Sequence, residues 1–191
     1  MSPVLLIVLA IIAIAIVWMV AMYNGFVQRR LRVDEAWSQI DVQLKRRHDL
    51  ISNLVNAVKG YMGFEQRVLE NVTQARANAV AAGAQGPRAQ AAAEGQLTEA
   101  LRSLFAVVEN YPDLKANQNV LSLQEQLTTT ENQISFSRQT YNTTVRAYNT
   151  GIATFPAALT AGMMGFTRRE FFEAEPAAAE LPTVDLRLPG A

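Results

Sequence analysis

The feature that most constrains this chain is an uncharged apolar run near its N-terminus. From Val4 to Met22 it has no charged side chain and no Asn, Gln, His or Gly. A transmembrane helix needs about 20 such residues to cross roughly 30 Å of hydrocarbon. A secretory signal peptide would instead have a basic start, a shorter apolar core and a small-residue cleavage site. The residues before the run include no Lys or Arg, and its end makes a poor cleavage site. We therefore predict a retained membrane anchor over residues 1–23.

The charges that flank this span predict its orientation. Arg29, Arg30 and Arg32 follow it closely, whereas no basic side chain precedes it. Because positive charge is retained on the cytoplasmic side, we predict a single-pass protein of the cell (inner) membrane. Its N-terminus would be outside and its folded domain cytoplasmic. The same three arginines would contact anionic lipid headgroups, each contributing about 1 kcal/mol of attraction.

The rest of the chain is long enough to bury a core, and its apolar residues follow helical spacing. Strand and hairpin signals are nearly absent. The clearest stripe, called here the apolar seam, repeats every three or four residues, and Arg47 fills one of its positions. No proline or glycine interrupts the chain between Gly25 and Lys59, which predicts one helix from the bilayer to about Lys59. The apolar members of the seam are Val33, Trp37, Ile40, Leu44, Ile51, Leu54 and Val58.

Three further helices are predicted, over residues 64–82, 88–109 and 114–155. Glycines near residue 83 and the prolines at positions 87, 112 and 156 mark their ends. Phe166, Phe171 and Phe172 would pack the chain back onto the helices. The predicted fold is all-α, with an N-terminal transmembrane helix that continues into an antiparallel four-helix bundle with long helices. The predicted domains are an anchor (1–23), a helical bundle (24–173) and an extended C-terminal tail (174–191).

Charged residues interrupt two otherwise apolar lines. Glu131 and Arg138 fall on the line of the last helix, and Arg47 falls on the apolar seam. A buried unpaired charge costs several kcal/mol, so each of them needs a partner. We expect a buried polar network that fixes helix register, with a polar pocket or switch as the alternative. Its candidate members are Arg47, Asp49, Glu65, Glu109, Glu131 and Arg138.

A Tyr-Asn pair occurs twice, one heptad apart, at Tyr141-Asn142 and Tyr148-Asn149. We expect the tyrosine rings in the core, with their hydroxyl groups reaching partners at its rim. The asparagines would bond to the backbone of a neighbouring loop. A ligand-binding role for these pairs is the alternative.

The composition excludes several kinds of chemistry. Without cysteine there is no thiol nucleophile and no zinc ribbon, and a single histidine excludes two-histidine metal sites. A net charge of zero argues against a protein that coats nucleic acid. His48 and Asp49 are neighbours in sequence, but adjacent helical residues point about 100° apart. We therefore predict no catalytic residue, no cofactor and no metal site, leaving open a loose Mg²⁺ or Ca²⁺ contact at carboxylates.

Long stretches of the chain resemble the LemA family. They run from Ala36 to Tyr61, Glu109 to Asn117, Glu131 to Pro156 and Phe171 to Glu175, in family order behind the same N-terminal span. One departure is Ser52, where the family usually has proline, and a straighter helix is expected there. The resemblance implies a single-pass bacterial membrane protein with a cytoplasmic helical bundle and no agreed enzymatic activity. It also implies a loose association with envelope stress, and members of the family are often encoded beside a membrane metalloprotease.

Three functional hypotheses follow. The first is a non-enzymatic, membrane-anchored scaffold or adaptor, linked to envelope stress or membrane protein quality control. It would associate with itself, because the bilayer confines and aligns its copies. Its partners would be copies of itself or a membrane protease complex. The second is a membrane-associated hydrolase with a polar cleft around His48, Asp49, Glu131 and Arg138. The third is an anionic-lipid-binding module that acts through the three arginines after the span. The apolar seam would face its own bundle or mediate self-association.

Overall fold

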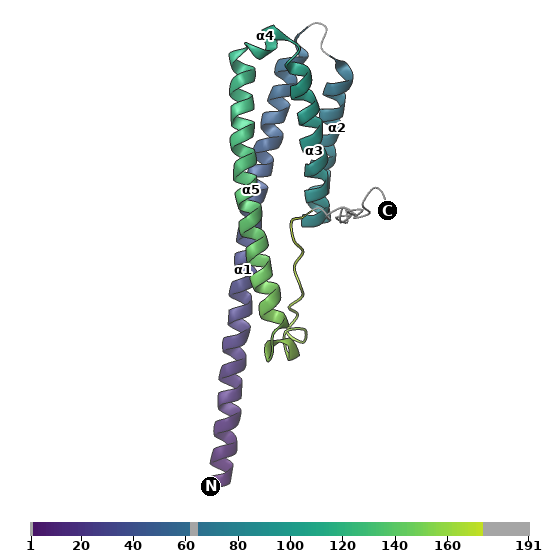
Figure 1. Ribbon diagram of the computed structural model, residues 1–191. Coiled ribbons are helices and arrows are strands. Elements are labelled where there is room, and N and C mark those ends of the chain that lie inside the picture. Colours follow the sequence, from purple (N-terminus) through teal and green to yellow (C-terminus); the bar gives the residue numbers. More distant parts are fainter. Residues whose placement is uncertain (1, 62–64, 174–191) are drawn as a thin grey trace, which may run out of the picture.

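The computed structural model describes residues 2–61 and 65–173, and in these ranges all regular structure is helical (Figure 1). The predicted all-α class and bundle are confirmed, and a one-turn helix, α4, is present in addition to the four long helices. The helices are α1 (Pro3–Lys59), α2 (Gln66–Ala82), α3 (Pro87–Val108), α4 (Pro112–Lys115) and α5 (Gln118–Ala153), with short 3₁₀ helices η1 (Gly83–Gln85) and η2 (Ala157–Leu159).

Helix α1 is one uninterrupted rod of 57 residues. It begins where Ser2 accepts a hydrogen bond from the Leu5 N–H through its side chain at 3.4 Å, and Pro3 occupies the first turn, where its missing N–H costs nothing. Its N-terminal part is long and apolar enough to cross a membrane, and this part is not covered by the rest of the protein. The predicted continuity from the span to Lys59 is confirmed.

The helices form two closely packed pairs. Helices α1 and α5 lie side by side, and α2 and α3 form a hairpin that covers the end of α1 far from the N-terminus (Figure 1). The apolar seam lies on α1 and is called the α1 seam from here on; it is buried in this arrangement, fully so except for the partly buried Trp37. The seam therefore faces its own bundle, and this settles the alternative of a self-association surface there.

The core has two parts along the rod. The membrane-proximal part joins α1 and α5 to the aromatic segment 166–173, with Phe166 and Phe172 buried and Phe171 partly buried as predicted. The distal part joins all four long helices and centres on Leu54, Leu97 and Leu104. The predicted helix ends agree within a few residues, except that α4 and α5 are separate. Asn117 causes this separation, because its side-chain oxygen caps α5 by accepting from the Asn119 and Val120 N–H groups. Residue 64 and the predicted tail 174–191 lie outside the described residues.

The two asparagines of the Tyr-Asn repeat hold the segment 166–173 against α5. Asn149 accepts from the Arg169 N–H and donates to the Arg169 carbonyl, both at 2.9 Å. Asn142 makes the same pair of bonds with Phe172, at 2.9 Å from the N–H and 3.4 Å to the carbonyl. Each amide side chain thus makes the two backbone hydrogen bonds that a neighbouring β-strand would otherwise make with this extended segment. The prediction that these asparagines bond to backbone is confirmed.

The two tyrosines of the repeat complete this attachment. The buried rings direct their hydroxyls to backbone carbonyls, Tyr141 to Glu170 at 2.8 Å and Tyr148 to Thr167 at 3.0 Å. Burial disfavours the charged tyrosinate, and it raises the pKa of Tyr141 from 10.0 to about 12 and also raises the pKa of Tyr148.

This shift predicts how stability depends on alkaline pH. A folded-state pKa above the unfolded value contributes stability that is fully present below pH 10 and is lost as the pH rises through about 12. We expect Tyr141→Phe to flatten this part of the stability profile, because the variant has no proton to lose at this position. Chemical unfolding at a series of pH values, with tyrosinate absorbance followed in parallel, measures it. Identical alkaline profiles for the two proteins would contradict the prediction.

Candidate functional site

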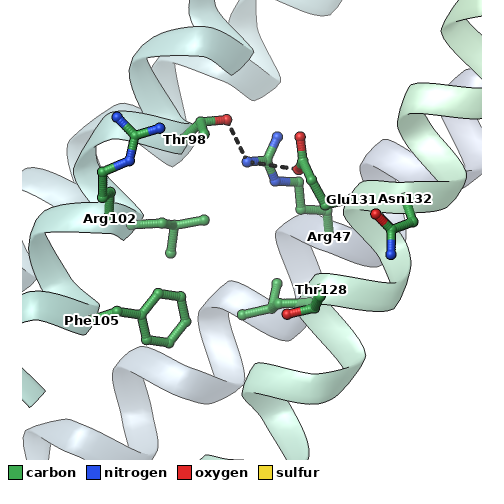
Figure 2. Close-up of a pocket in the computed structure, with 9 residues that line it drawn as sticks. Arg47, Thr98, Arg102, Phe105, Thr128, Glu131 and Asn132 are labelled. Carbon is green, nitrogen blue, oxygen red and sulfur yellow. Dashed lines mark hydrogen bonds and ion pairs between the residues drawn. The ribbon is translucent and has the colours of Figure 1, made fainter. Parts of the chain in front are cut away.

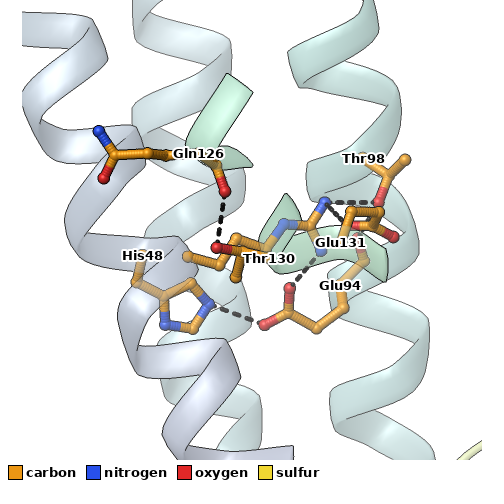
Figure 3. Close-up of polar contacts among 7 residues, drawn as sticks. His48, Glu94, Thr98, Gln126, Thr130 and Glu131 are labelled. Carbon is orange, nitrogen blue, oxygen red and sulfur yellow. Dashed lines mark hydrogen bonds and ion pairs between the residues drawn. The ribbon is translucent and has the colours of Figure 1, made fainter. Parts of the chain in front are cut away.

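A cluster of buried charged side chains lies between α1 and α3 (Figure 3). Arg47 and His48 on α1 and Glu94 on α3 are 3%, 6% and 5% exposed. The Arg47 Nη1 donates to Glu94 Oε2 at 3.0 Å, and the His48 Nε2 lies 2.7 Å from Glu94 Oε1. Two consecutive residues of α1 therefore occupy both oxygens of one carboxylate. We call these three residues, with Thr98 and Glu131, the charge cluster.

Through Arg47, the charge cluster also contacts a third helix, α5. Its Nη2 donates to the Thr98 hydroxyl at 2.7 Å and forms an ion pair with Glu131 of α5 at 3.2 Å. The Glu131 side chain is 49% exposed, so this second ion pair is wetter than the pair with Glu94. The buried pair is the one whose disruption would be costly, because water cannot replace a lost partner there.

A pocket of about 300 Å³ opens beside the charge cluster, between α3 and α5 (Figure 2). Arg47 and Glu131 form its polar end, and Thr98 lies beside them. Its walls are mostly apolar. The remaining lining residues are Leu101, Arg102, Phe105, Leu127, Thr128 and Asn132.

The hydrogen bonds of the charge cluster limit what it can do chemically. Both Glu94 oxygens have partners, and the Thr98 hydroxyl donates to the Glu94 carbonyl while it accepts from Arg47. The arrangement is therefore a closed set of ion pairs and holds no nucleophile activated by a base. Among residues 2–61 and 65–173, no group of three or more acidic or histidine side chains is placed to hold a metal ion.

The structure joins two of the six predicted network residues, Arg47 and Glu131. It places the other four, Asp49, Glu65, Glu109 and Arg138, on the surface. The predicted burial of Arg138 is wrong, because the buried line of α5 passes through Thr130 and Ser137 instead. These small hydroxyl side chains are tolerated inside the bundle, where Thr130 donates to the Gln126 carbonyl of its own helix. The register-fixing role of the Arg47–Glu131 contact remains a proposal.

Sequence reasoning missed the partner at the centre of the charge cluster, Glu94. The signal was present, since stepping back from Leu101 and Leu97 at helical spacing reaches Glu94 and then Gln90, and all four are buried. The alanines around Glu94 make this buried face hard to recognise in the sequence, because they place apolar residues on every side of the helix. The sequence places His48 only in the polar cleft of the hydrolase hypothesis, whereas in the structure it is a partner of Glu94 on α3.

The polar cleft required by the hydrolase hypothesis is not formed by its four residues. His48 is buried against Glu94, whereas Asp49 and Arg138 are exposed. Of the four, only His48 and Glu131 belong to the charge cluster. The arginines predicted to contact lipid, Arg29, Arg30 and Arg32, are exposed on α1 just after its apolar part.

The chain is similar in sequence, over most of its length, to proteins named MamQ and LemA. The magnetosome protein MamQ 2 of Paramagnetospirillum magneticum is 27% identical over 179 residues, and MamQ of Magnetospirillum gryphiswaldense is 26% identical over the same length. Each alignment covers 81% of this chain and 66% of the relative, so the chain spans just under two thirds of their length. Protein LemA of Metamycoplasma hominis is 25% identical over 132 residues, which is 69% of this chain and 60% of that protein.

None of these relatives is named for an enzymatic reaction. The LemA family itself matches residues 36–186, a range that begins on α1 within the α1 seam and includes the charge cluster and both Tyr-Asn pairs. This match covers well over half of the sequence and agrees with the resemblance of its individual motifs. The chain therefore belongs to the LemA family.

Proposed function

We propose that this protein is a membrane-anchored, non-catalytic scaffold or adaptor that gathers protein partners, including copies of itself, at the cytoplasmic face of the cell membrane. The names of its relatives describe a magnetosome protein and a LemA protein and no reaction, which supports a structural role. The excess of arginines directly after the span supports the cytoplasmic placement of the bundle. A link to envelope stress or to a membrane protease complex is part of this proposal.

The observation that carries the proposal is the continuity of α1 from the apolar span to the far end of the bundle. From Met22 to Lys59 a straight helix rises about 55 Å, so the distal bundle is held well away from the bilayer. With no loop between anchor and bundle, lateral association of the spans would set the distance and orientation of neighbouring bundles. That geometry suits a protein that positions others.

The pocket between α3 and α5 is where we expect a partner side chain to enter. Its apolar walls, with Phe105 and Leu127, are open to the outside although the polar end is closed by ion pairs. Because the chain has no cysteine, a single one can be introduced at Thr128 on the rim of this pocket.

The test is cross-linking in native membranes with a photoactivatable maleimide on Thr128→Cys. We expect a cross-linked product of defined mass, because a scaffold holds its partners in fixed geometry. The matched control is Thr129→Cys, an exposed position on α5 that does not line the pocket, which should give much less product. Recovery of only the monomer from both variants would refute the scaffold, and equal products from both would refute the pocket as the contact.

A further inference from the structure

The loop that follows α5 lies at the level where the apolar part of α1 ends (Figure 1). The Thr160 hydroxyl contacts the Met22 sulfur at 3.8 Å, and the Phe166 ring packs on Tyr23 and Phe26 with centroids 5.5 and 5.2 Å apart. Met22 is the last residue of the run that is long enough to cross the bilayer. If α1 spans the membrane, this loop lies at the boundary between acyl chains and headgroups.

Three large apolar side chains of this loop point away from the protein. Phe155, Leu159 and Met163 are 82%, 69% and 89% exposed, whereas Ala157 and Ala161 between them are buried. The three exposed residues are spaced four apart. The backbone of this segment makes helical bonds, from Ala158 to Thr154 and from Ala161 to Ala157. The segment consists of the 3₁₀ helix η2 and adjoining turns, and it exposes these three side chains while its alanines pack inward. Exposed apolar side chains of this kind are typical of segments that lie at a membrane interface.

A basic groove of about 690 Å³ lies just beyond the loop, between α1 and α5. Arg29 and Arg32 of α1 and Arg146 of α5 line it, and its other described lining residues carry no charge. Gly151 allows this arrangement, because a Cβ at that position would overlap the Arg29 guanidinium. Arg29 comes seven residues after Met22, which is about 10 Å further along the helix, a depth that suits lipid phosphates.

We propose that these two features form one membrane collar, made of Phe155, Leu159 and Met163 together with Arg29, Arg32 and Arg146, which seats the bundle on the surface of the bilayer. The three apolar side chains enter the upper acyl region, and the arginines bind the phosphates of anionic lipids in the groove. The apolar surface of the collar continues that of the α1 span, and its charge complements an anionic leaflet. The collar rests on the proposed membrane anchoring but not on the scaffold role.

The collar fixes how the bundle stands on the membrane. A single helix can tilt and rotate in a bilayer, but a second contact on the neighbouring helix restricts both motions. The segment 166–173 then transmits this placement to α5, because the Tyr-Asn pairs hold it along that helix.

The insertion of the loop is tested with the full chain in lipid nanodiscs. An environment-sensitive fluorophore on Met163→Cys should be quenched by lipids that carry a quencher near the headgroup. The matched control is Phe136→Cys, another exposed apolar position (72%), which lies about 20 Å further along α5 from Gly151 and should not be quenched. If a second copy of the chain covered the loop instead, the probe at position 163 would be shielded from water but not quenched by the lipids. That result would overturn the proposal.

A third probe distinguishes failure of the collar from failure of the anchor. Val17→Cys lies in the apolar span and must be quenched by lipids with a deep quencher if α1 crosses the bilayer. Quenching at position 17 without quenching at position 163 refutes the collar alone. No quenching at position 17 refutes the anchoring on which the collar rests.

The arginine groove is tested by lipid selectivity. In spin-label measurements of lipids bound to the full chain, we expect anionic phosphatidylglycerol to be preferred over zwitterionic phosphatidylcholine. Arg29→Gln and Arg146→Gln should each lower this preference about fivefold, which corresponds to about 1 kcal/mol per arginine. The control is Arg138→Gln, an exposed arginine further along α5 and outside the groove, which should leave the preference unchanged. Equal effects of the three substitutions would overturn the assignment of the groove.

Discussion

Replacing Glu94 by alanine is expected to lower the free energy of unfolding by about 3–5 kcal/mol, the largest loss we predict for a single polar residue here. The substitution leaves Arg47 and His48 buried beside an empty position where the carboxylate accepted from both of them. Arg47 keeps Thr98 and the half-exposed Glu131, but neither replaces the buried charge that lay 3.0 Å from its guanidinium.

Thermal unfolding of the full-length protein in detergent, followed by helical circular dichroism, measures this loss. At about 2 °C or more per kcal/mol for a chain of this size, the midpoint should fall by at least about 6 °C. The matched control is Glu99→Ala on the same helix, whose partner Arg102 lies in an exposed pair and whose loss should cost less than about 1 kcal/mol. Equal shifts of the unfolding midpoint for the two variants would show that the burial of Glu94 does not increase its contribution to stability.

A double replacement distinguishes the stability lost when one partner of the Arg47–Glu94 pair is removed from the stability that the intact pair contributes. Arg47→Met combined with Glu94→Met removes both charges, and we expect it to recover more than half of the stability lost in Glu94→Ala. Apolar residues of similar volume often replace a buried ion pair without loss, because they avoid its desolvation. If the charge cluster fixes helix register, the double variant will still be stable but will show faster amide hydrogen exchange in α3.

The parts of this fold that the sequence predicts well are those with long, uninterrupted patterns. The α1 rod follows from an apolar run joined to a seam without glycine or proline. The seam residues from Val33 to Val58 are buried as their spacing requires, apart from the partly buried Trp37. The attachment of the segment 166–173 also follows from pattern, because a Tyr-Asn pair repeated at seven residues places both pairs on the same side of α5.

The charge cluster was predicted less well, for a physical reason. Whether a charged residue near an apolar line is buried depends on a partner from another helix, and one sequence does not give the contacts between helices. Arg138 and Glu131 occupy equivalent places beside the buried line of α5, but Glu131 forms an ion pair with Arg47 of α1, whereas Arg138 is exposed to solvent. The exposure of Phe155, Leu159 and Met163 could not be predicted either, because these residues lie outside the regular helices and no periodic pattern gives the orientation of their side chains.

The second large effect is expected from Asn142→Leu, which should lower the free energy of unfolding by about 2–4 kcal/mol. Leucine matches the size of asparagine but leaves both the N–H and the carbonyl of the buried Phe172 without their amide partner. An unsatisfied buried backbone group costs about 1–3 kcal/mol, and two are created together. The segment 166–173 should therefore loosen on α5, and the membrane-proximal core should open before the distal one.

Trp37 reports this opening directly, because its ring packs on Tyr141 and Phe172 with centroids 5.3 and 5.7 Å away. With Trp18 in the span replaced by phenylalanine, Trp37 is the one remaining tryptophan, and a water-soluble quencher should reach it more readily in Asn142→Leu. The control is Asn71→Leu on the exposed face of α2, which should change neither stability nor quenching. If Trp37 is equally protected in both variants, the asparagine bonds do not hold the segment, and the aromatic contacts alone suffice to keep it on α5.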